Sequence, residues 1–565
     1  MENEKNNADD RVVAIPRYLK DNACSGTYNL QVTSYAGYIN VDQIKENYLY
    51  YWFFESRATG QTDVSAIPLV IWLNGGPGAS SLAGLFLENG PFLLKDTGEN
   101  QAEIAENESG WNQKVHLMYW DQPVGTGFSY TGTESYAQSE KELSEQFFNA
   151  LQGFFELHRD YRDCDLYITG ESYAGKYIPN MAKMIKDKNE SLPDDQKINL
   201  KGLALGDGWM YPRLQTKLQV DYGYEMGFVD TLQKSTAETL YREYCDAMDR
   251  KDMTAAFNLG NNVSNMVLSC AGNPDIYDVR RWNDLPIKNL KDYLSCDNVK
   301  KAIYAKGDWQ FADASSIVAD NLMDDLETDV TGLFPELIKK YRMLFYTGNF
   351  DMSCGYSSTE QILQSWNYEK KWTGLIRKVW TKEQPAGTGD LPPTLGYVND
   401  LNNLSQVVIP DSGHQVPVSK PIASLLMINN WVFKQEFNGY LPTTVQAKIK
   451  WVDTGIAISE DVKTTVRYLS GTWTANPETR FVDAGGNSKL KAKTGYPLPG
   501  ANEGALCGKV GESGDVFLID KENDIPNGLS GNLFLCINDD LDGIYGAGFA
   551  DNEGSVTVAV ITDVD

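Results

Sequence analysis

Apolar runs and helical patterns alternate along the first 440 residues of the chain. Six short apolar runs each stop at or near Gly, Asn, Asp or Pro, and they span residues 68–73, 115–120, 166–169, 200–205, 343–346 and 407–409. Runs of this kind are typical of strands that are buried on both faces of a parallel sheet. Between two of them, Leu and Phe recur at helical spacing over residues 139–158, which indicates an amphipathic helix. The alternation predicts a doubly wound sheet.

Three further patterns complete this part of the chain. Residues 37–56 alternate aromatic and polar positions around a polar connection, which predicts a β-hairpin and makes the sheet mixed. Over about residues 213–341, charged helical segments are broken by Asn, Gly and Pro, and the pattern of a buried strand does not occur. We expect a helical cap inserted there. Residues 422–433 predict a closing helix.

The pattern changes after the sequence Asn-Gly-Tyr-Leu-Pro at residues 438–442. Beyond it glycine is frequent, long helical patterns stop, and short strand-like runs occupy residues 515–519, 532–537 and 556–561. Such a pattern is typical of a small all-β sandwich. We therefore expect an α/β domain over residues 1–445 and a β-sandwich domain over residues 446–565.

Charge and composition exclude several classes of function. The chain has 50 Lys and Arg against 77 Asp and Glu, a net charge of −27. Nucleic acids and anionic lipids are bound through clustered Lys and Arg, so neither is an expected partner. A membrane-spanning helix needs about 18 or more apolar residues in succession, and residues 422–433 are too short for one.

The start of the chain and the cysteines indicate in which compartment the protein is found. The first ten residues, MENEKNNADD, lack the apolar segment of a secretory leader. The eight cysteines include no CxxC pair and indicate neither a zinc site nor a dense disulfide framework. These features favour the cytoplasm, or release by a route without a signal peptide.

A candidate nucleophile, Ser172, follows the run at 166–169 within Gly170-Glu-Ser-Tyr-Ala174. Small residues on either side of a serine permit the tight strand-to-helix turn that exposes its hydroxyl. Taken alone, this pattern is more often an ordinary turn. Its weight comes from the residues that accompany it.

A serine nucleophile needs a base, and the chain has three histidines. His116 lies inside an apolar run and His158 in a helix rich in Phe, so both are expected to be structural. His414 follows the run at 407–409, in a loop, and Asp351 follows the run at 343–346. The order Ser, Asp, His is that of α/β-hydrolases.

With these residues in place, the chain resembles the serine carboxypeptidases of the α/β-hydrolase class, of the carboxypeptidase Y type. The motifs that carry the resemblance are WLNGGPGASS (72–81), ENGPF (88–92), DQPVGTGFSY (121–130), GESYAGKYIP (170–179), GNFDMSCGY (348–356) and GHQVP (413–417). The similarity covers roughly residues 25–437. It implies an α/β-hydrolase fold with a helical cap, and hydrolysis of the C-terminal peptide bond of peptides.

The resemblance also implies residue roles. Ser172 would attack the carbonyl, His414 would accept its proton, and Asp351 would orient the imidazole. The backbone N–H groups of Gly76 and Tyr173 would stabilise the oxyanion. No cofactor is expected for catalysis.

A carboxypeptidase must recognise a peptide with a free C-terminal carboxylate, and Asn74, Glu88 and Glu171 match the family positions that do this. Two glutamates beside a carboxylate must share protons, because like charges in close contact raise one pKa. An acidic activity optimum is the expected consequence.

Departures from the family pattern matter as well. Ala79 stands where the family commonly has a cysteine, so a disulfide from this loop to the insertion is missing, which fits a reducing compartment. Cys354 matches a free thiol of the carboxypeptidase Y type; sensitivity to mercurials and an inert buried thiol are equal alternatives.

The C-terminal segment resembles the β-sandwich of soluble bacterial galactophilic lectins at residues 471–473, 507–511, 537–539 and 551–555. That resemblance implies calcium bound by Asp539, Asp551 and Asn552, and a carbohydrate partner. A structural sandwich with acidic turns is the alternative.

Two other functions stay open at this point. An acyltransferase or lyase on the same scaffold would use the same nucleophile. A binding protein would use only its β-sandwich. The complete Ser-Asp-His set, together with Asn74 and Glu171, favours the carboxypeptidase.

Overall fold

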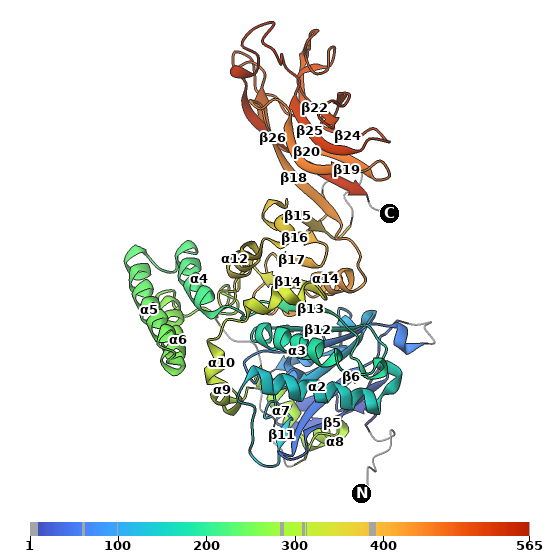
Figure 1. The fold of residues 1–565 in the computed structure, drawn as a ribbon, viewed down its shortest axis with the longest axis vertical. Helices are drawn as coiled ribbons and strands as arrows, with labels where there is room; N and C mark the ends of the chain where they lie inside the picture. The colour runs from blue at the N-terminus through green and yellow to red at the C-terminus, as the bar shows by residue number, and fades with distance from the viewer. Residues whose placement is uncertain are drawn as a thin grey trace. The chain divides into compact units, whose positions relative to one another are not determined.

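The computed structural model describes residues 10–58, 63–98, 100–282, 287–307, 311, 314–383 and 391–563. Figure 1 traces the chain, which divides into two compact units. The N-terminal unit comprises residues 1–373 and 400–435, and the C-terminal unit comprises residues 374–399 and 436–565. Residues 374–399 belong with the C-terminal unit because one of their strands, β15 (Lys378–Thr381), pairs with β18 (Gly439–Gln446).

A mixed sheet forms the centre of the N-terminal unit, in the order β11-β6-β10-β7-β12-β13-β14-β17 with β5 beside β6. Its strands are β5 (Ser34–Asp42), β6 (Asn47–Phe54), β7 (Leu69–Leu73), β10 (His116–Asp121), β11 (Tyr130–Thr131), β12 (Leu166–Glu171), β13 (Leu200–Gly206), β14 (Arg342–Gly348) and β17 (Leu404–Ile409). From β10 to β17 the neighbours are parallel, whereas β6 is antiparallel to β5, β10 and β11. All six apolar runs form strands, so the predicted mixed α/β fold is confirmed.

Helices cover this sheet, which is why its central strands are apolar throughout. Every residue of β7 is buried, and Figure 1 shows α2 (Glu140–Leu157) and α3 (Ala174–Asn189) lying together over the sheet. The helix α14 (Pro421–Val432) packs Trp431 against Tyr167 of β12, with ring centroids 5.2 Å apart. The remaining helices outside the insertion are α1 (Leu82–Leu87), α12 (Tyr356–Trp366) and α13 (Val416–Ser419).

The segment between β13 and β14 is helical, as expected. Its helices are α4 (Pro212–Glu225), α5 (Thr231–Asp249), α6 (Met253–Cys270), α7 (Ile287–Ser295), α8 (Asp297–Ala302), α9 (Ser316–Asn321), α10 (Met323–Leu326) and α11 (Phe334–Leu337). Valines buried where α4 meets α6, including Val220, Val263 and Val267, form a core of their own. The insertion therefore packs as a structured part of the unit.

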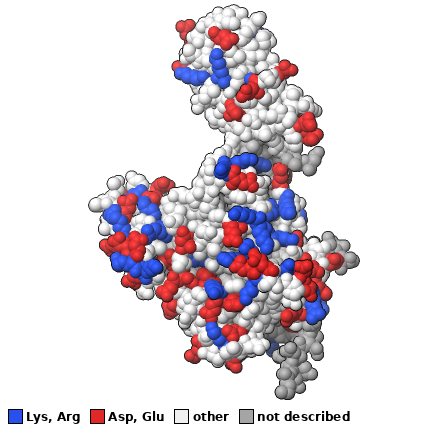
Figure 2. Space-filling model, viewed as in Figure 1, with Lys and Arg blue, Asp and Glu red and all other residues white. Residues whose placement is uncertain are grey.

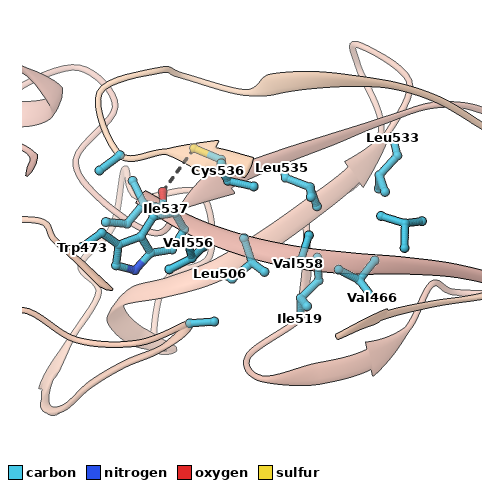
Figure 3. Packing of buried hydrophobic residues seen from close by; sticks show 14 of the residues in the cluster. Val466, Trp473, Leu506, Ile519, Leu533, Leu535, Cys536, Ile537, Val556 and Val558 are labelled. Carbon is cyan, nitrogen blue, oxygen red and sulfur yellow. Dashed lines mark hydrogen bonds between the residues drawn. The ribbon is translucent and has the colours of Figure 1, made fainter. Parts of the chain in front are cut away.

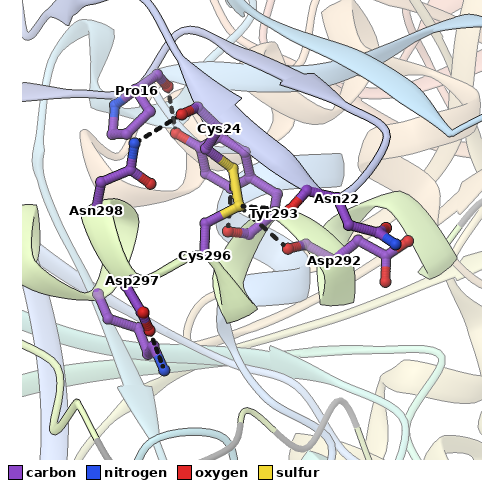
Figure 4. The surroundings of a disulfide bond; sticks show 9 residues. Pro16, Asn22, Cys24, Asp292, Tyr293, Cys296, Asp297 and Asn298 are labelled. Carbon is purple, nitrogen blue, oxygen red and sulfur yellow. Dashed lines mark hydrogen bonds and ion pairs between the residues drawn. A yellow bond between two sulfur atoms is a disulfide. The ribbon is translucent and has the colours of Figure 1, made fainter.

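Two small sheets and one disulfide were not predicted from the sequence. One sheet has the order β3-β2-β9-β8, and the other pairs β1 with β4. Their strands are β1 (Ala14–Ile15), β2 (Tyr18–Lys20), β3 (Ala23–Ser25), β4 (Tyr28–Asn29), β8 (Phe92–Gly98) and β9 (Gln101–Glu106). Cys24 of β3 forms a disulfide with Cys296, 272 residues away, and Asn298 donates to the carbonyl oxygen of Cys24 beside it (Figure 4). The bond ties the N-terminal strands to the helical insertion.

The C-terminal unit is built from antiparallel strands in two groups that share one core. One group runs β16-β15-β18-β26-β20-β24, and the other runs β19-β25-β22-β21 with β23 beside β22. Besides β15 and β18, the strands are β16 (Thr394–Leu401), β19 (Val452–Ile458), β20 (Lys463–Thr474), β21 (Gly485–Lys491), β22 (Asn502–Val510), β23 (Phe517–Leu518), β24 (Glu522–Asp524), β25 (Gly531–Ile537) and β26 (Glu553–Asp563). Figure 3 shows Trp473 and Val558 from one group packed with Leu506 and Leu535 from the other. The expected all-β architecture is confirmed.

Charged side chains of both signs are mixed over the visible surface of the described residues (Figure 2). Some join in pairs, such as Lys186 with Glu336 at 2.8 Å. Every helix in the described part of the chain falls short of the length and apolar character that a membrane crossing requires.

Candidate active site

Ser172 lies at a strained turn between β12 and α3. Its φ of 61° is in the left-handed region, which non-glycine residues rarely adopt. The turn is held by hydrogen bonds from the Ser172 N–H to the Gly206 carbonyl oxygen (3.0 Å) and from the Trp209 N–H to the Ser172 carbonyl oxygen (2.8 Å). A Cβ at Gly170 would lie 2.3 Å from the Leu73 carbonyl oxygen, so only glycine fits there. The small residues of the motif therefore allow close packing around the serine.

Asp351 and His414 follow β14 and β17, two neighbouring strands of the sheet. His414 Nδ1 lies 2.8 Å from Asp351 Oδ2, and both residues are buried. The carboxylate also accepts hydrogen bonds from the N–H groups of Ser353 (2.8 Å) and Cys354 (3.1 Å). The other imidazole nitrogen, Nε2, has no hydrogen-bond partner among the described residues. An imidazole held in this way can accept a proton at Nε2.

Ser172 lies at the same edge of the sheet as Asp351 and His414. Among the described residues it makes no hydrogen bond to the His414 imidazole. The strands β12, β13, β14 and β17 are parallel neighbours, so their carboxyl ends share one edge. Tyr277 lies near both His414 and Ser172. Its ring centroid is 4.8 Å from that of His414, and it lines a cavity together with Ser172. Catalytic hydrogen bonds are often long in free enzymes and tighten when substrate binds.

The other two histidines lie in structural contacts. His116 Nδ1 accepts from the Ser56 N–H at 3.1 Å, and burial lowers the pKa of its imidazole. His158 Nε2 lies 2.8 Å from an oxygen of Asp10. Both contacts hold segments of the N-terminal unit together, as expected from the apolar surroundings of these residues in the sequence.

The loop after β7 packs directly on the serine turn. A Cβ at Gly75 would lie 2.3 Å from the Tyr173 backbone nitrogen, so the two backbones touch. Gly76 has a φ of 105°, which favours glycine, and lines the cavity with Ser172 and Tyr173. The N–H groups of Gly76 and Tyr173 donate to no other described residue. Two unused donors beside a serine hydroxyl are what an oxyanion requires.

The same loop is tied to the helical insertion by backbone contacts. Ala79 forms a β-bridge with Ala314, and the Ser315 N–H donates to the Gly78 carbonyl oxygen at 2.9 Å. The structure thus joins loop and insertion at the position where the family commonly has a cysteine.

Asn74, Glu88 and Glu171 form one buried cluster, as the resemblance implies. Asn74 Nδ2 donates to Glu88 Oε1 (3.1 Å) and to Glu171 Oε1 (2.9 Å). Its Oδ1 accepts from Trp72 Nε1 and the Gly84 N–H, which fixes the orientation of the amide. The second oxygen of each glutamate, Oε2, has no hydrogen-bond partner among the described residues.

The two glutamates also interact with each other, and both are protonated more readily than exposed ones. Burial raises the pKa of Glu88 from 4.5 to about 7. Burial, and then the charge of Glu88, raise the pKa of Glu171 well above its ordinary value. A pair of this kind retains at least one proton near neutral pH.

Asp207, which was not among the expected site residues, adjoins this edge of the sheet. It follows β13, is fully buried and interacts with Asp351. The sequence signal was an aspartate directly after the run at 200–205, in Gly-Asp-Gly.

A cavity of about 620 Å³ opens beside Ser172. Phe257 and Leu268 of α6 and Glu327, all from the insertion, line part of it. Cys354 also lines it, and burial raises the pKa of the thiol well above its ordinary value. A thiol kept protonated is a poor nucleophile, which favours the inert alternative for Cys354.

One group of potential metal ligands occurs at this edge within the described residues, namely Asp351, Cys354 and His414. Its carboxylate and imidazole already bond to each other, and its thiol is protonated. Metal ligation needs the thiolate, so this group fits a catalytic pair better than a metal.

In the C-terminal unit, the structure brings Asp539 and Asn552 together. Both are buried, and Asp539 Oδ2 and Asn552 Oδ1 lack hydrogen-bond partners within the described residues. Burial raises the pKa of Asp539 to about 6. Asp551 is half-buried, and its charge acts on Asp539. Asp540, which was not expected, has a further unpartnered buried oxygen, Oδ1.

Comparison with known proteins gives a consistent picture for the N-terminal unit. A model of the family described as serine carboxypeptidase matches residues 25–434. Serine carboxypeptidase-like 48 of Arabidopsis thaliana is 32% identical over 441 residues, covering 75% of this chain and 82% of its own. A pheromone-processing carboxypeptidase, KEX1, of Phytophthora infestans is 30% identical over 75% of this chain and 72% of its own.

A solved structure shows the same fold. The crystal structure of Kex1(delta)p, a prohormone-processing carboxypeptidase from Saccharomyces cerevisiae, matches with a TM-score of 0.64 and 22% identity. The match covers 78% of this chain and 98% of the yeast chain.

Proposed function

The chain belongs to the serine carboxypeptidase family, and on that premise we propose that Ser172, His414 and Asp351 hydrolyse the C-terminal peptide bond of peptides. The observation that carries these assignments is the buried contact of 2.8 Å between His414 Nδ1 and Asp351 Oδ2, at the sheet edge where Ser172 stands on its strained turn. Asp351 accepts a hydrogen bond from Nδ1–H of His414, which leaves Nε2 as the base.

The geometry supports the following reaction. Nε2 of His414 accepts the hydroxyl proton of Ser172 as Oγ attacks the scissile carbonyl carbon. The N–H groups of Gly76 and Tyr173 stabilise the resulting oxyanion, each contributing about 3 kcal/mol. The same proton passes from His414 to the leaving amine, which departs as the released amino acid. Water then cleaves the acyl-enzyme by the same steps, with His414 accepting and returning a proton.

The Asn74–Glu88–Glu171 cluster supports recognition of the free C-terminus. Asn74 Nδ2 donates to both glutamates, and the pair retains a proton that can be donated to a substrate carboxylate. When the pair loses this proton, it repels the carboxylate. This supports activity that is highest at mildly acidic pH.

The first test compares an N-blocked dipeptide with its C-terminal amide at pH 5. We expect release of the C-terminal residue from the free acid, and no hydrolysis by Ser172→Ala. A fluorophosphonate should label the wild type and not this variant. If the wild type transfers its acyl group to an alcohol but does not hydrolyse the dipeptide, the acyltransferase alternative is correct. If the wild type is not labelled, the hydrolase site is inactive.

We also propose a calcium site in the C-terminal unit, held by Asp539, Asn552 and Asp551. Buried oxygens without hydrogen-bond partners, Asp539 Oδ2 and Asn552 Oδ1, support it. Calcium prefers carboxylate and amide oxygens, so the donor set fits the ion. When bound, the ion would supply positive charge that offsets the burial of Asp539.

Calorimetric titration with CaCl₂ tests this site. Asp539→Asn should weaken binding, whereas Asp461→Asn, at an exposed position of the same unit, should leave it unchanged. Equal binding by both variants would exclude the site. Repeating the titration with galactose tests the carbohydrate partner that the lectin resemblance implies.

A further inference from the structure

Asp207 lies at the carboxyl end of β13, between the strands that lead to Ser172 and Asp351. It is fully buried. The Gly348 N–H donates to its Oδ1 at 3.0 Å and approaches Oδ2 at 3.3 Å. The Asp207 N–H donates to the Tyr346 carbonyl oxygen at 2.8 Å. These contacts fix the residue against β14, the strand that leads to Asp351.

The groups that face Asp207 are acidic or neutral. Asp351 contacts its carboxyl, and Glu171 acts on it from the end of β12. The Tyr346 hydroxyl and the Cys354 thiol are near enough to feel the charge of Asp207, and burial keeps both protonated. Among the described residues, the groups that act most strongly on Asp207 include no cation. Two adjoining carboxylates without a compensating cation cannot both be ionised in a buried site.

The hydrogen bonds decide which carboxyl carries the charge. Asp351 accepts from three donors, His414 Nδ1 and the N–H groups of Ser353 and Cys354. Asp207 accepts from one, the Gly348 N–H. Donors stabilise the ionised form, so Asp351 is the carboxylate and the proton of the pair resides on Asp207. In agreement, burial and then Asp351 raise the pKa of Asp207 well above its ordinary value.

We propose that Asp207 is a neutral carboxylic acid that donates a hydrogen bond to Asp351 and thereby positions the acid of the triad. The proposal rests on the catalytic assignment of Asp351 made above. Asp207 is not among the residues that line the cavity beside Ser172, and His414 Nδ1 bonds to Asp351, so Asp207 is a positioning residue. Its proton keeps one negative charge behind the imidazole and limits rotation of the Asp351 carboxylate.

Two variants of similar size separate this role from simple packing. Asp207→Asn keeps a donor toward Asp351, and we expect kcat within about threefold of the wild type. Asp207→Leu fills the space without a donor, and we expect a loss of about 10–100-fold in kcat, as for residues that orient other catalytic ligands. Equal losses in both variants would overturn the proposal.

The pH profile of kcat/KM tests the protonation state directly. If Asp207 is neutral, Asp207→Asn removes no charge, and the acid limb of the profile stays where it is. If Asp207 is ionised, the same change removes a negative charge beside the triad and moves the acid limb to lower pH by about one unit or more. That movement would refute the proposal.

Infrared difference spectroscopy gives a readout that needs no activity. The spectrum of the wild type minus that of Asp207→Asn, recorded near pH 7, should contain the carbonyl band of a protonated carboxylic acid. Exposed aspartates are ionised at that pH and do not contribute. Absence of the band would refute the neutral state of Asp207, even if the catalytic assignment is correct. If the band is present but the wild type hydrolyses no peptide, the catalytic assignment fails instead.

Discussion

The Glu88–Glu171 pair should make the preference for a free C-terminus depend on pH. Both carboxyls are buried, and Asn74 Nδ2 donates to one oxygen of each. Burial raises the pKa of Glu88 to about 7; burial, and then the charge of Glu88, raise the pKa of Glu171 well above its ordinary value. Below pH 7 the pair therefore retains protons for a substrate carboxylate. As the pH rises through 7, the pair gains negative charge.

The size of the effect follows from titration and Coulomb's law. A group with a pKa of about 7 passes from about 90% protonated at pH 6 to about 10% at pH 8. Two like charges about 4 Å apart repel by about 4 kcal/mol in surroundings of intermediate polarity, and each 1.4 kcal/mol is tenfold in affinity. The ionised pair is then almost unable to bind a carboxylate. We expect kcat/KM for a free-acid dipeptide to fall about tenfold from pH 6 to pH 8, relative to its C-terminal amide.

The assay is the ratio of kcat/KM values for the acid and the amide, measured from pH 5 to pH 8. Titration of the triad affects both substrates and cancels in the ratio. The double variant Glu88→Gln/Glu171→Gln has no proton to lose, so its ratio should not change with pH. Glu156→Gln, at an exposed position of α2, should behave as the wild type. A ratio that is constant in the wild type, or that still falls in the double variant, would refute the reasoning.

Three further predictions concern other parts of the N-terminal unit. Ser172→Ala should lower kcat by about 10⁶-fold without changing the melting temperature, as measured by peptide hydrolysis and calorimetry. Glu140 is buried, its carboxyl has no hydrogen-bond partner among the described residues, and burial raises its pKa to about 8. Glu140→Gln should therefore raise the melting temperature at pH 8, and have little effect at about pH 3, where the carboxyl is neutral in both the folded and the unfolded chain. Cys24→Ser should lower the free energy of unfolding by about 2–5 kcal/mol in urea titrations, whereas Cys270→Ser, which changes an exposed free cysteine, should leave it unchanged.

The sequence predicted the parts of the fold in which burial leaves a continuous run of apolar residues. Strands such as β7 and β12 are buried on both faces, so every position before the Glu171 that ends β12 is apolar or small, and the strand ends are visible. The strand β8 could not be found in this way, because only its first residues are buried and the rest reach solvent. The Cys24–Cys296 disulfide was also beyond reach, since its partners are 272 residues apart and no spacing rule relates them.

The residues of the candidate site also differ in how far the sequence could predict them. Ser172, Asp351 and His414 each follow a recognisable strand, so their meeting at one edge of the sheet could be inferred from topology. Asn74, Glu88 and Glu171 were expected to meet only because of the family resemblance; the side chain of Asn74 that joins them is oriented by Trp72 and Gly84, contacts that have no sequence signal. Asp207 was missed for another reason, because its role depends on a hydrogen bond from Gly348, a residue of another strand.

Buried carboxyls change the meaning of the formal charge of −27, which counts every Asp and Glu as ionised. Burial raises the pKa of Glu88 to about 7 and of Glu140 to about 8, and those of Glu171 and Asp207 well above their ordinary values. Between about pH 4.5 and these values the folded chain holds protons that the unfolded chain has released. The contribution of these four groups to stability therefore falls as the pH rises through this range, because the folded state binds more protons at them. The proton retention that supports recognition of a carboxylate by Glu88 and Glu171 thus also contributes most to stability on the acidic side of neutrality, where the proposed activity is highest.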